Sequence, residues 1–163
     1  MMPSGTVTHS MGCPSRLAFE LLHDYSRRLE WDPLLSEARL TRGCTEAAKG
    51  ATSLCVGKAQ FGRIGIETRY ITFSPYSIAA VEMINHPPWF DTFAASIRHT
   101  DTPEGSEMTY KFRFSAKPRM LRWMVEPIML FILRAETKKR LHALAAFLAT
   151  LPCEQGEGRV LFK

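Results

Sequence analysis

The sequence predicts an α+β fold in which an antiparallel sheet of about seven strands packs against one long C-terminal helix. Three observations predict it: short apolar segments separated by turn residues, one segment with strict alternation, and an apolar stripe at helical spacing near the C-terminus. Short connections favour antiparallel pairing, because parallel strands need long crossovers. We also expect two short helices between the first strand and the rest of the sheet.

The first strand is expected at residues 6–11, and Pro14 then suits the first turn of a helix, where its missing N–H costs nothing. Leu17, Leu21 and Leu22 recur at helical spacing and define that helix. A second short helix over 26–31 must end before Pro33, because proline disfavours α conformation in the residue that precedes it.

Six further strands are separated by turn signals such as Arg42-Gly43 and Ser74-Pro75. Their expected ranges are 37–41, 52–58, 63–73, 78–84, 91–99 and 107–116. The clearest alternation runs from Met108 to Phe114, where apolar and polar residues take turns. That pattern indicates one buried face and one face in water.

The chain closes with a helical block. We expect a short helix over 117–125, a break or fresh helix start at Pro127, and a long helix over 128–148. Its apolar stripe comprises Ile128, Phe131, Ile132, Ala135, Leu141, Leu144, Ala145 and Leu148. Residues 1–151 are expected to form a single domain, with a loose tail from residue 152.

The chain has 163 residues and a formal net charge of +5, and residues 117–142 carry the whole positive excess. Such a segment could attract nucleic acid or an anionic membrane surface. A solvated helix face is the more usual cause of such a run of charges and is the interpretation we adopt. We therefore predict no nucleic-acid partner, and we leave a transient contact with a membrane surface open.

The cysteine pattern and the N-terminus bear on the compartment. Cys13, Cys44, Cys55 and Cys153 form no C-x-x-C motif, and no histidine pair has zinc-finger spacing, so we expect neither a metal nor another cofactor. The N-terminus lacks a basic start followed by an apolar run, and no uncharged segment of about 20 residues is present. These features favour a reduced, cytoplasmic protein.

Four motifs resemble one family. M-G-C-P-S-R-L-A-F-E-L-L-H-D-Y, R-R-L-E-W-D-P-L, E-G-S-E-M-T-Y-K-F-R-F and A-K-P-R-M-L-R-W-M-V-E-P-I-M-L-F-I-L are similar to segments of the START-like (SRPBCC) superfamily, in its polyketide cyclase/dehydrase and lipid transport branch. The resemblance covers residues 5–150. It implies a helix-grip fold, in which a curved sheet wraps around the long helix. It also implies a hydrophobic cavity between them that holds lipids, polyketides, sterols or other apolar molecules.

The candidate cavity-lining residues follow from the aromatic strand face, the C-terminal helix and the loops at the sheet ends. They are Trp31, Tyr70, Met83, Trp89, Phe90, Phe93, Tyr110, Phe112, Phe114, Met124, Ile128, Phe131 and Ile132. The same side chains could instead pack into a solid core at ordinary protein density.

Two short stretches carry alternative interpretations. Trp31 and Asp32 form either a turn before Pro33 or the rim of the cavity, and the Asp-Pro turn explains both residue types. The stretch N-H-P-P-W-F, residues 85–90, is either a gate of Trp89 and Phe90 or a two-proline turn that covers the core edge.

Three functions remain open at this point. The first is binding or transport of a small hydrophobic ligand. The second is a cyclase or dehydrase that uses acid–base chemistry, which requires Tyr70, Tyr110, His86 or His99 to converge on the cavity. The third is an interaction module that docks on a protein or membrane through the basic helix face or the Trp89-Phe90 loop. The sequence does not predict the oligomeric state.

Overall fold

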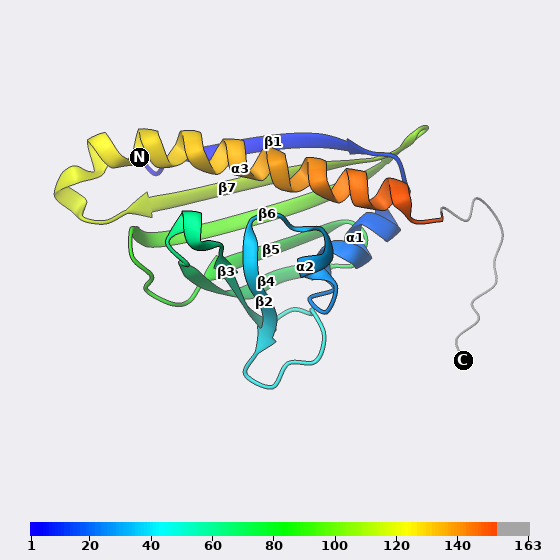
Figure 1. Ribbon diagram of the computed structural model, residues 1–163, viewed down its shortest axis with the longest axis horizontal. Coiled ribbons are helices and arrows are strands. Elements are labelled where there is room, and N and C mark those ends of the chain that lie inside the picture. The colour runs from blue at the N-terminus through cyan, green and yellow to red at the C-terminus, as the bar shows by residue number, and fades with distance from the viewer. Residues whose placement is uncertain (153–163) are drawn as a thin grey trace.

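A computed structural model describes residues 1–152 and places seven strands in one antiparallel sheet beside a long helix (Figure 1). The expected order of elements is confirmed. It runs β1 (Ser4–Met11), α1 (Ser15–His23), α2 (Arg28–Trp31), β2 (Leu35–Thr41), β3 (Thr52–Gly57), η1 (Ala59–Phe61), β4 (Gly65–Ser74), β5 (Ile78–Met83), β6 (Phe90–Thr102), β7 (Gly105–Ala116), η2 (Arg119–Leu121) and α3 (Arg122–Thr150). The tail predicted to be loose lies, from residue 153 on, outside the described residues.

The strand order is β1-β7-β6-β5-β4-β3-β2, so the first strand closes one edge beside the last. Register shifts at Leu35/Glu37, Tyr70/Thr72 and Phe90/Thr92 interrupt three strand pairs. Such bulges bend a sheet and increase its twist. In Figure 1, α3 runs along β1 and β7, while α1 and α2 lie beside its C-terminal half.

The alternation in β7 produces the core. Met108, Tyr110, Phe112 and Phe114 are all buried, whereas Lys111 and Arg113 between them are exposed. Three leucines of α3, Leu141, Leu144 and Leu148, belong to the same cluster. The prediction of one buried and one solvated face is therefore confirmed, and burial of this face holds α3 against the sheet.

Pro127 does not interrupt the last helix, and the predicted short helix over 117–125 is wrong. The 3-10 turn η2 leads directly into α3, which runs through Pro127. Proline lacks the N–H that would bond to the carbonyl four residues earlier, here that of Trp123, and its ring clashes with that carbonyl. Because Pro127 lies early in α3, only one preceding turn of the helix is affected.

The first turn of α3 is also anchored to the end of β7. Arg122 Nε donates to the Ala116 carbonyl at 2.8 Å, and the Ala116 N–H donates to the Glu126 carboxylate at 3.0 Å. Arg122 Nη2 further donates to Asp91 Oδ2 at 2.6 Å. These charge-assisted contacts fix the helix start independently of the backbone bond that Pro127 removes.

The predicted apolar stripe is correct in the C-terminal half of α3 and wrong in the N-terminal half. Ile128 and Phe131 are exposed, at 58% and 76%. The side chains that pack inward there are Met129, Leu130 and Leu133. Apolar residues occupy every side of this part of the helix, so their spacing alone does not select the buried face.

Candidate functional site

A cavity of about 440 Å³ lies between the sheet and α3. Its size falls in the range of about 300–1,000 Å³ typical of small-molecule sites. Strands β2 to β7, η1 and the α1–α2 segment supply its other walls. The apolar part includes Leu34, Leu35, Phe61, Ile64, Ile66, Val81, Phe93, Ile97, Met129 and Leu133.

Strand geometry explains why β4 contributes every second residue. Ile66, Thr68 and Tyr70 line the cavity, and Ile64 just before the strand does so too. Glu67 and Arg69, which alternate with them, are absent from the wall, since successive side chains of a strand point to opposite faces. Tyr70, which the sequence analysis expects to line the cavity, therefore shares its side of the strand with Ile64, Ile66 and Thr68.

The structure brings part of the predicted site together. The residues on the cavity wall are Tyr70, Trp89, Phe90, Phe93, Tyr110 and Ile132. They come from β4, β6, β7, α3 and the loop before β6, so only the tertiary fold makes them neighbours. Whether any of them contacts a ligand remains a proposal.

The other predicted residues are not on this wall, for two reasons. Phe112 and Phe114 are 3% and 0% exposed and belong to the core, and Met83 is partly buried against the same core cluster. Met124, Ile128 and Phe131 are exposed on the outer side of α3, because the helix turns Met129 and Leu133 inward instead.

Trp31 does not line the cavity either. Its position decides between the two interpretations of the Trp31-Asp32 stretch, a turn before Pro33 or the rim of the cavity. Trp31 is buried, with the Arg28 guanidinium 4.8 Å from its ring centre. Asp32 Oδ1 accepts the Leu34 N–H at 3.1 Å, which is the expected turn before Pro33. The Trp31-Asp32 stretch is therefore a structural corner rather than a rim.

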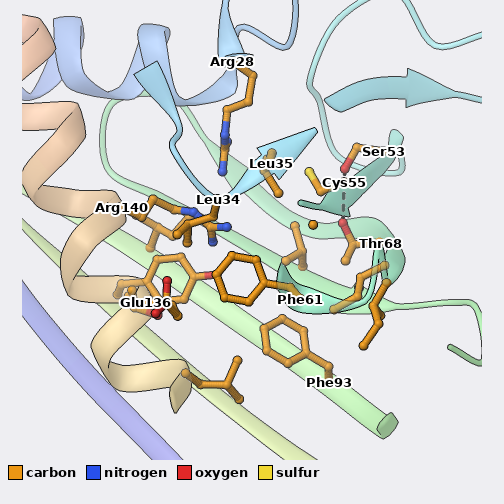
Figure 2. Close-up of a pocket in the computed structure, with 18 of the residues that line it drawn as sticks. Arg28, Leu34, Leu35, Ser53, Cys55, Phe61, Thr68, Phe93, Glu136 and Arg140 are labelled. Atoms are coloured by element: carbon orange, nitrogen blue, oxygen red, sulfur yellow. Dashed lines mark hydrogen bonds between the residues drawn. The ribbon is translucent and has the colours of Figure 1, made fainter. Parts of the chain in front are cut away.

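Asp32 has a second role that the sequence analysis missed. Its Oδ2 lies 3.0 Å from Arg28 Nε and 2.9 Å from Arg140 Nε, and both arginines line the cavity. Figure 2 shows the ends of the Arg28 and Arg140 side chains turned toward each other at one side of the pocket. The four-residue spacing of Arg28 and Asp32 could have predicted the first ion pair from the sequence. No feature of the sequence predicts the second pair, because Arg140 lies far from Asp32 along the chain.

The two arginines keep Asp32 charged. Burial acts to raise the pKa of Asp32, but Arg140 and Arg28 outweigh it and hold the pKa below its usual value. Cys55 lies on the same side of the cavity, where burial raises the pKa of its thiol above the usual range. We call Arg28, Cys55, Tyr110 and Arg140 the polar end of the cavity, and Asp32 lies behind the two arginines as their ion-pair partner.

A second polar group forms a chain of buried hydrogen bonds on the wall. The Tyr25 hydroxyl donates to Ser53 Oγ at 2.9 Å and lies 3.0 Å from the Tyr70 hydroxyl. Tyr70 lies 2.8 Å from His23 Nδ1. Because Tyr25 gives its proton to Ser53, Tyr70 donates to Tyr25 and His23 Nδ1–H donates to Tyr70.

Burial sets the protonation of this chain. It lowers the pKa of His23 to about 3, with Arg28 as the second cause. It raises the pKa of Tyr25, and it raises that of Tyr70 well above the usual value. All three groups are therefore neutral near pH 7.

The stretch at residues 85–90 joins the cavity to the surface. Asn85 fixes it, since its side chain accepts from the Glu67 N–H at 3.0 Å and donates to the Gly65 carbonyl at 2.8 Å. Trp89 is 55% exposed yet belongs to the cavity wall, whereas Phe90 is buried against Phe93 and Phe114. Trp89 therefore lies at the mouth.

The two histidines predicted for acid–base chemistry are not on the wall. His86 is exposed in the loop, and His99 is buried against Phe19, with ring centres 5.2 Å apart. Among residues 1–152, no group of three or more His, Cys, Asp or Glu side chains could hold a metal ion. Over the same residues, no helix is both long and apolar enough to cross a membrane.

The family model described as polyketide cyclase / dehydrase and lipid transport matches residues 2–149. The chain belongs to this family. The resemblance found in the sequence motifs is thereby confirmed. No curated protein matches the chain.

Solved structures show the same fold at low identity. The Zhui aromatase/cyclase from Streptomyces sp. R1128 is 13% identical, with a TM-score of 0.75 over 91% of this chain and 94% of that one. The di-domain aromatase/cyclase StfQ from the steffimycin pathway, also 13% identical, has a TM-score of 0.77 over 91% of this chain and 51% of its own. Protein CV1439 from Chromobacterium violaceum is 10% identical, with a TM-score of 0.65 over 89% and 96% of the two chains.

Proposed function

We propose that this member of the cyclase/dehydrase and lipid-transport family binds or carries a small hydrophobic molecule in the cavity between sheet and α3. The observation that carries the proposal is the cavity itself, about 440 Å³ with mostly apolar walls. A packed core would have filled this space, because protein interiors are as dense as organic crystals. We also propose, from the sequence features described above, that the protein is cytoplasmic.

A cavity-filling substitution tests the proposal. Val81→Trp places an indole in the cavity, whereas Ala80→Trp places it on the other face of β5. We expect the neutral probe N-phenyl-1-naphthylamine to bind the wild type and Ala80→Trp, and to bind Val81→Trp at least about tenfold more weakly. Fluorescence titration measures this, and mass spectrometry of organic extracts shows what the wild type retains.

Equal probe affinity in both tryptophan variants would contradict binding in this cavity. Circular dichroism of each variant establishes that it is folded. Absence of probe binding to the folded wild type, with an empty organic extract, would remove the carrier proposal altogether.

The protonation of the wall supports binding rather than acid–base catalysis. Tyr70 and Tyr110 do line the cavity, as a cyclase or dehydrase would require. However, burial raises the pKa of both phenols and lowers that of His23 to about 3. General acid–base groups work best with pKa values near the working pH, and these three are displaced from it.

A specific observation favours a second candidate function, docking on an anionic lipid surface. One face of η2 and the first turns of α3 exposes large apolar side chains, which we call the α3 strip. The strip comprises Met120, Trp123, Met124, Ile128 and Phe131. Steps of three, one, four and three residues keep them within one broad side of the helix.

The surroundings of the α3 strip fit a membrane with negative headgroups. Arg119, Arg134 and Lys138 are exposed along the same segment. Apolar and aromatic side chains flanked by basic ones are typical of helices that lie in a membrane interface. Trp89 and Ile132 are exposed and also line the cavity, so the same region gives an apolar ligand access to the site.

Vesicle sedimentation tests the docking. We expect the wild type to sediment with vesicles of phosphatidylcholine and phosphatidylglycerol, and less with phosphatidylcholine alone. Phe131→Glu should reduce sedimentation several-fold, whereas Leu29→Glu, at an exposed leucine of α2 outside the strip, should not. Equal sedimentation of both variants would contradict docking of the α3 strip on the membrane. Gel filtration that showed a dimer formed through the α3 strip would contradict it as well.

A further inference from the structure

The polar end of the cavity holds more positive than negative charge. Arg28 and Arg140 are 10% and 19% exposed at their side chains, and Asp32, fully buried, is their shared counter-ion. Both oxygens of Asp32 are engaged, one by the Leu34 N–H and one by the two guanidinium groups. One positive charge therefore remains at this end, and burying a charge without a partner is costly.

Glu136 is the one carboxylate that the described residues place on the cavity wall, and it does not remove this excess. Its Oε1 accepts from Lys139 Nζ at 2.9 Å, so the pair is neutral as a whole. Its Oε2 is buried without a hydrogen-bond partner among the described residues. Figure 2 shows Glu136 on α3, on the same side of the pocket as Arg140.

The polar end also offers unused hydrogen-bond donors. Arg28 uses Nε for Asp32 and Nη1 for the Leu22 carbonyl, which leaves its Nη2 with no partner in residues 1–152. Arg140 likewise donates no hydrogen bond to a described residue, since its buried Nε lies 2.9 Å from Asp32 Oδ2 as an ion pair without a hydrogen bond. The Tyr110 hydroxyl makes no hydrogen bond within the same range, and its raised pKa keeps it protonated as a donor.

We propose that the bound molecule is an amphipathic carboxylic acid, whose carboxylate is held by Arg140, Arg28 and the Tyr110 hydroxyl. This inference rests on the proposed ligand-binding function and names the chemical class of the ligand. The apolar body lies against the other side of the pocket, where Figure 2 shows Phe93 away from the arginines. A carboxylate cancels the excess charge and accepts several charge-assisted hydrogen bonds, which an alcohol or an ester cannot do.

Three probes with the same chain length separate the head groups: decanoate, decanol and methyl decanoate. Calorimetric titration near neutral pH should show decanoate binding at least about tenfold more tightly than the other two. Arg140→Met should bring decanoate to the affinity of decanol. Lys138→Met removes the same charge from an exposed site on the same helix, and should leave the preference intact.

Two further variants keep the test independent of folding defects. Tyr110→Phe removes a hydroxyl that has no hydrogen-bond partner in residues 1–152, so it should fold normally and weaken decanoate binding several-fold. Glu136→Gln removes the carboxylate of the wall and should strengthen decanoate binding. N-phenyl-1-naphthylamine should bind both, because it is neutral.

The outcomes distinguish this inference from the function on which it rests. If decanoate and decanol bind the wild type equally, or if Arg140→Met keeps the preference, the carboxylate assignment is wrong and the carrier proposal stands. If neither the three probes nor N-phenyl-1-naphthylamine binds, the carrier proposal fails as well.

Discussion

Asp32 is the residue on which the α2 corner and α3 both depend. It joins Arg28, four residues earlier, to Arg140 of the last helix, and its own side chain is 0% exposed. Its Oδ1 also fixes the turn into β2 through the Leu34 N–H. One carboxylate thus ties the corner to the helix that closes the cavity, and losing its charge leaves two buried arginines without a counter-ion.

We therefore predict that Asp32→Asn destabilises the protein by about 3–5 kcal/mol, the usual cost of breaking a buried ion pair from one side. Urea unfolding followed by circular dichroism measures the change. Glu20→Gln is the control, because Glu20 and its ion-pair partner Arg16 are exposed to solvent and the substitution should leave the stability almost unchanged. Similar losses in the two variants would show that Asp32 is not a structural centre.

At the scale of elements, the hairpin between β6 and β7 also holds the end of β1. Thr102 pairs with Gly105 across a two-residue turn, and Ser106 Oγ donates to the Cys13 carbonyl at 2.8 Å. Gly105 has φ +145°, and a Cβ there would lie 2.4 Å from the Met11 carbonyl oxygen. The hairpin and the chain after β1 can approach this closely only because residue 105 has no side chain.

Gly105→Ala is accordingly expected to destabilise the protein by about 2 kcal/mol or more, from backbone strain together with steric overlap. Gly43→Ala separates the two causes, since Gly43 also has a positive φ, +77°, but a Cβ there would meet no atom within 4 Å. It should cost about 1 kcal/mol. Thermal unfolding of both variants measures their stability. An equal loss of stability in the two would mean that the backbone at Met11 moves aside to accommodate the new methyl group at little cost.

On the scale of the whole molecule, two buried histidines couple stability to pH. His23 and His99 are 8% and 5% exposed, and burial lowers their pKa values from 6.5 to about 3 and about 4. Neither nitrogen of His99 has a hydrogen-bond partner among the described residues. Below pH 6.5 the unfolded chain binds protons at these positions while the native protein does not.

The stability that the protein gains by keeping the two histidines neutral is thus fully retained above pH 6.5. It is lost as the pH falls toward about 4 for His99 and about 3 for His23. When the pH falls from about 7.5 to about 5, each of the two histidines should lower the free energy of unfolding by about 1–2 kcal/mol. His99→Leu should remove roughly half of this pH dependence, whereas His86→Gln, at an exposed site, should leave it unchanged. Urea midpoints at both pH values measure it, and an unchanged slope in His99→Leu would contradict the assignment.

The order of elements, the buried face of β7 and the family could all be predicted from the sequence. Turn residues, strand alternation and motif order are local features, so the chain carries them without reference to its packing. The same local signals identified Tyr70 and Tyr110 as inward-facing residues, and the structure places both on the cavity wall.

Packing in three dimensions sets which side of the N-terminal half of α3 faces the sheet and where the charges of the cavity lie. Around Ile128 and Phe131 the helix is apolar on all sides, so its rotation is set by packing against β1 and β7 rather than by its own pattern. That rotation turns Arg140 toward Asp32, more than a hundred positions earlier. Long-range ion pairs of this kind leave no local trace, because they exist only after the helix has docked.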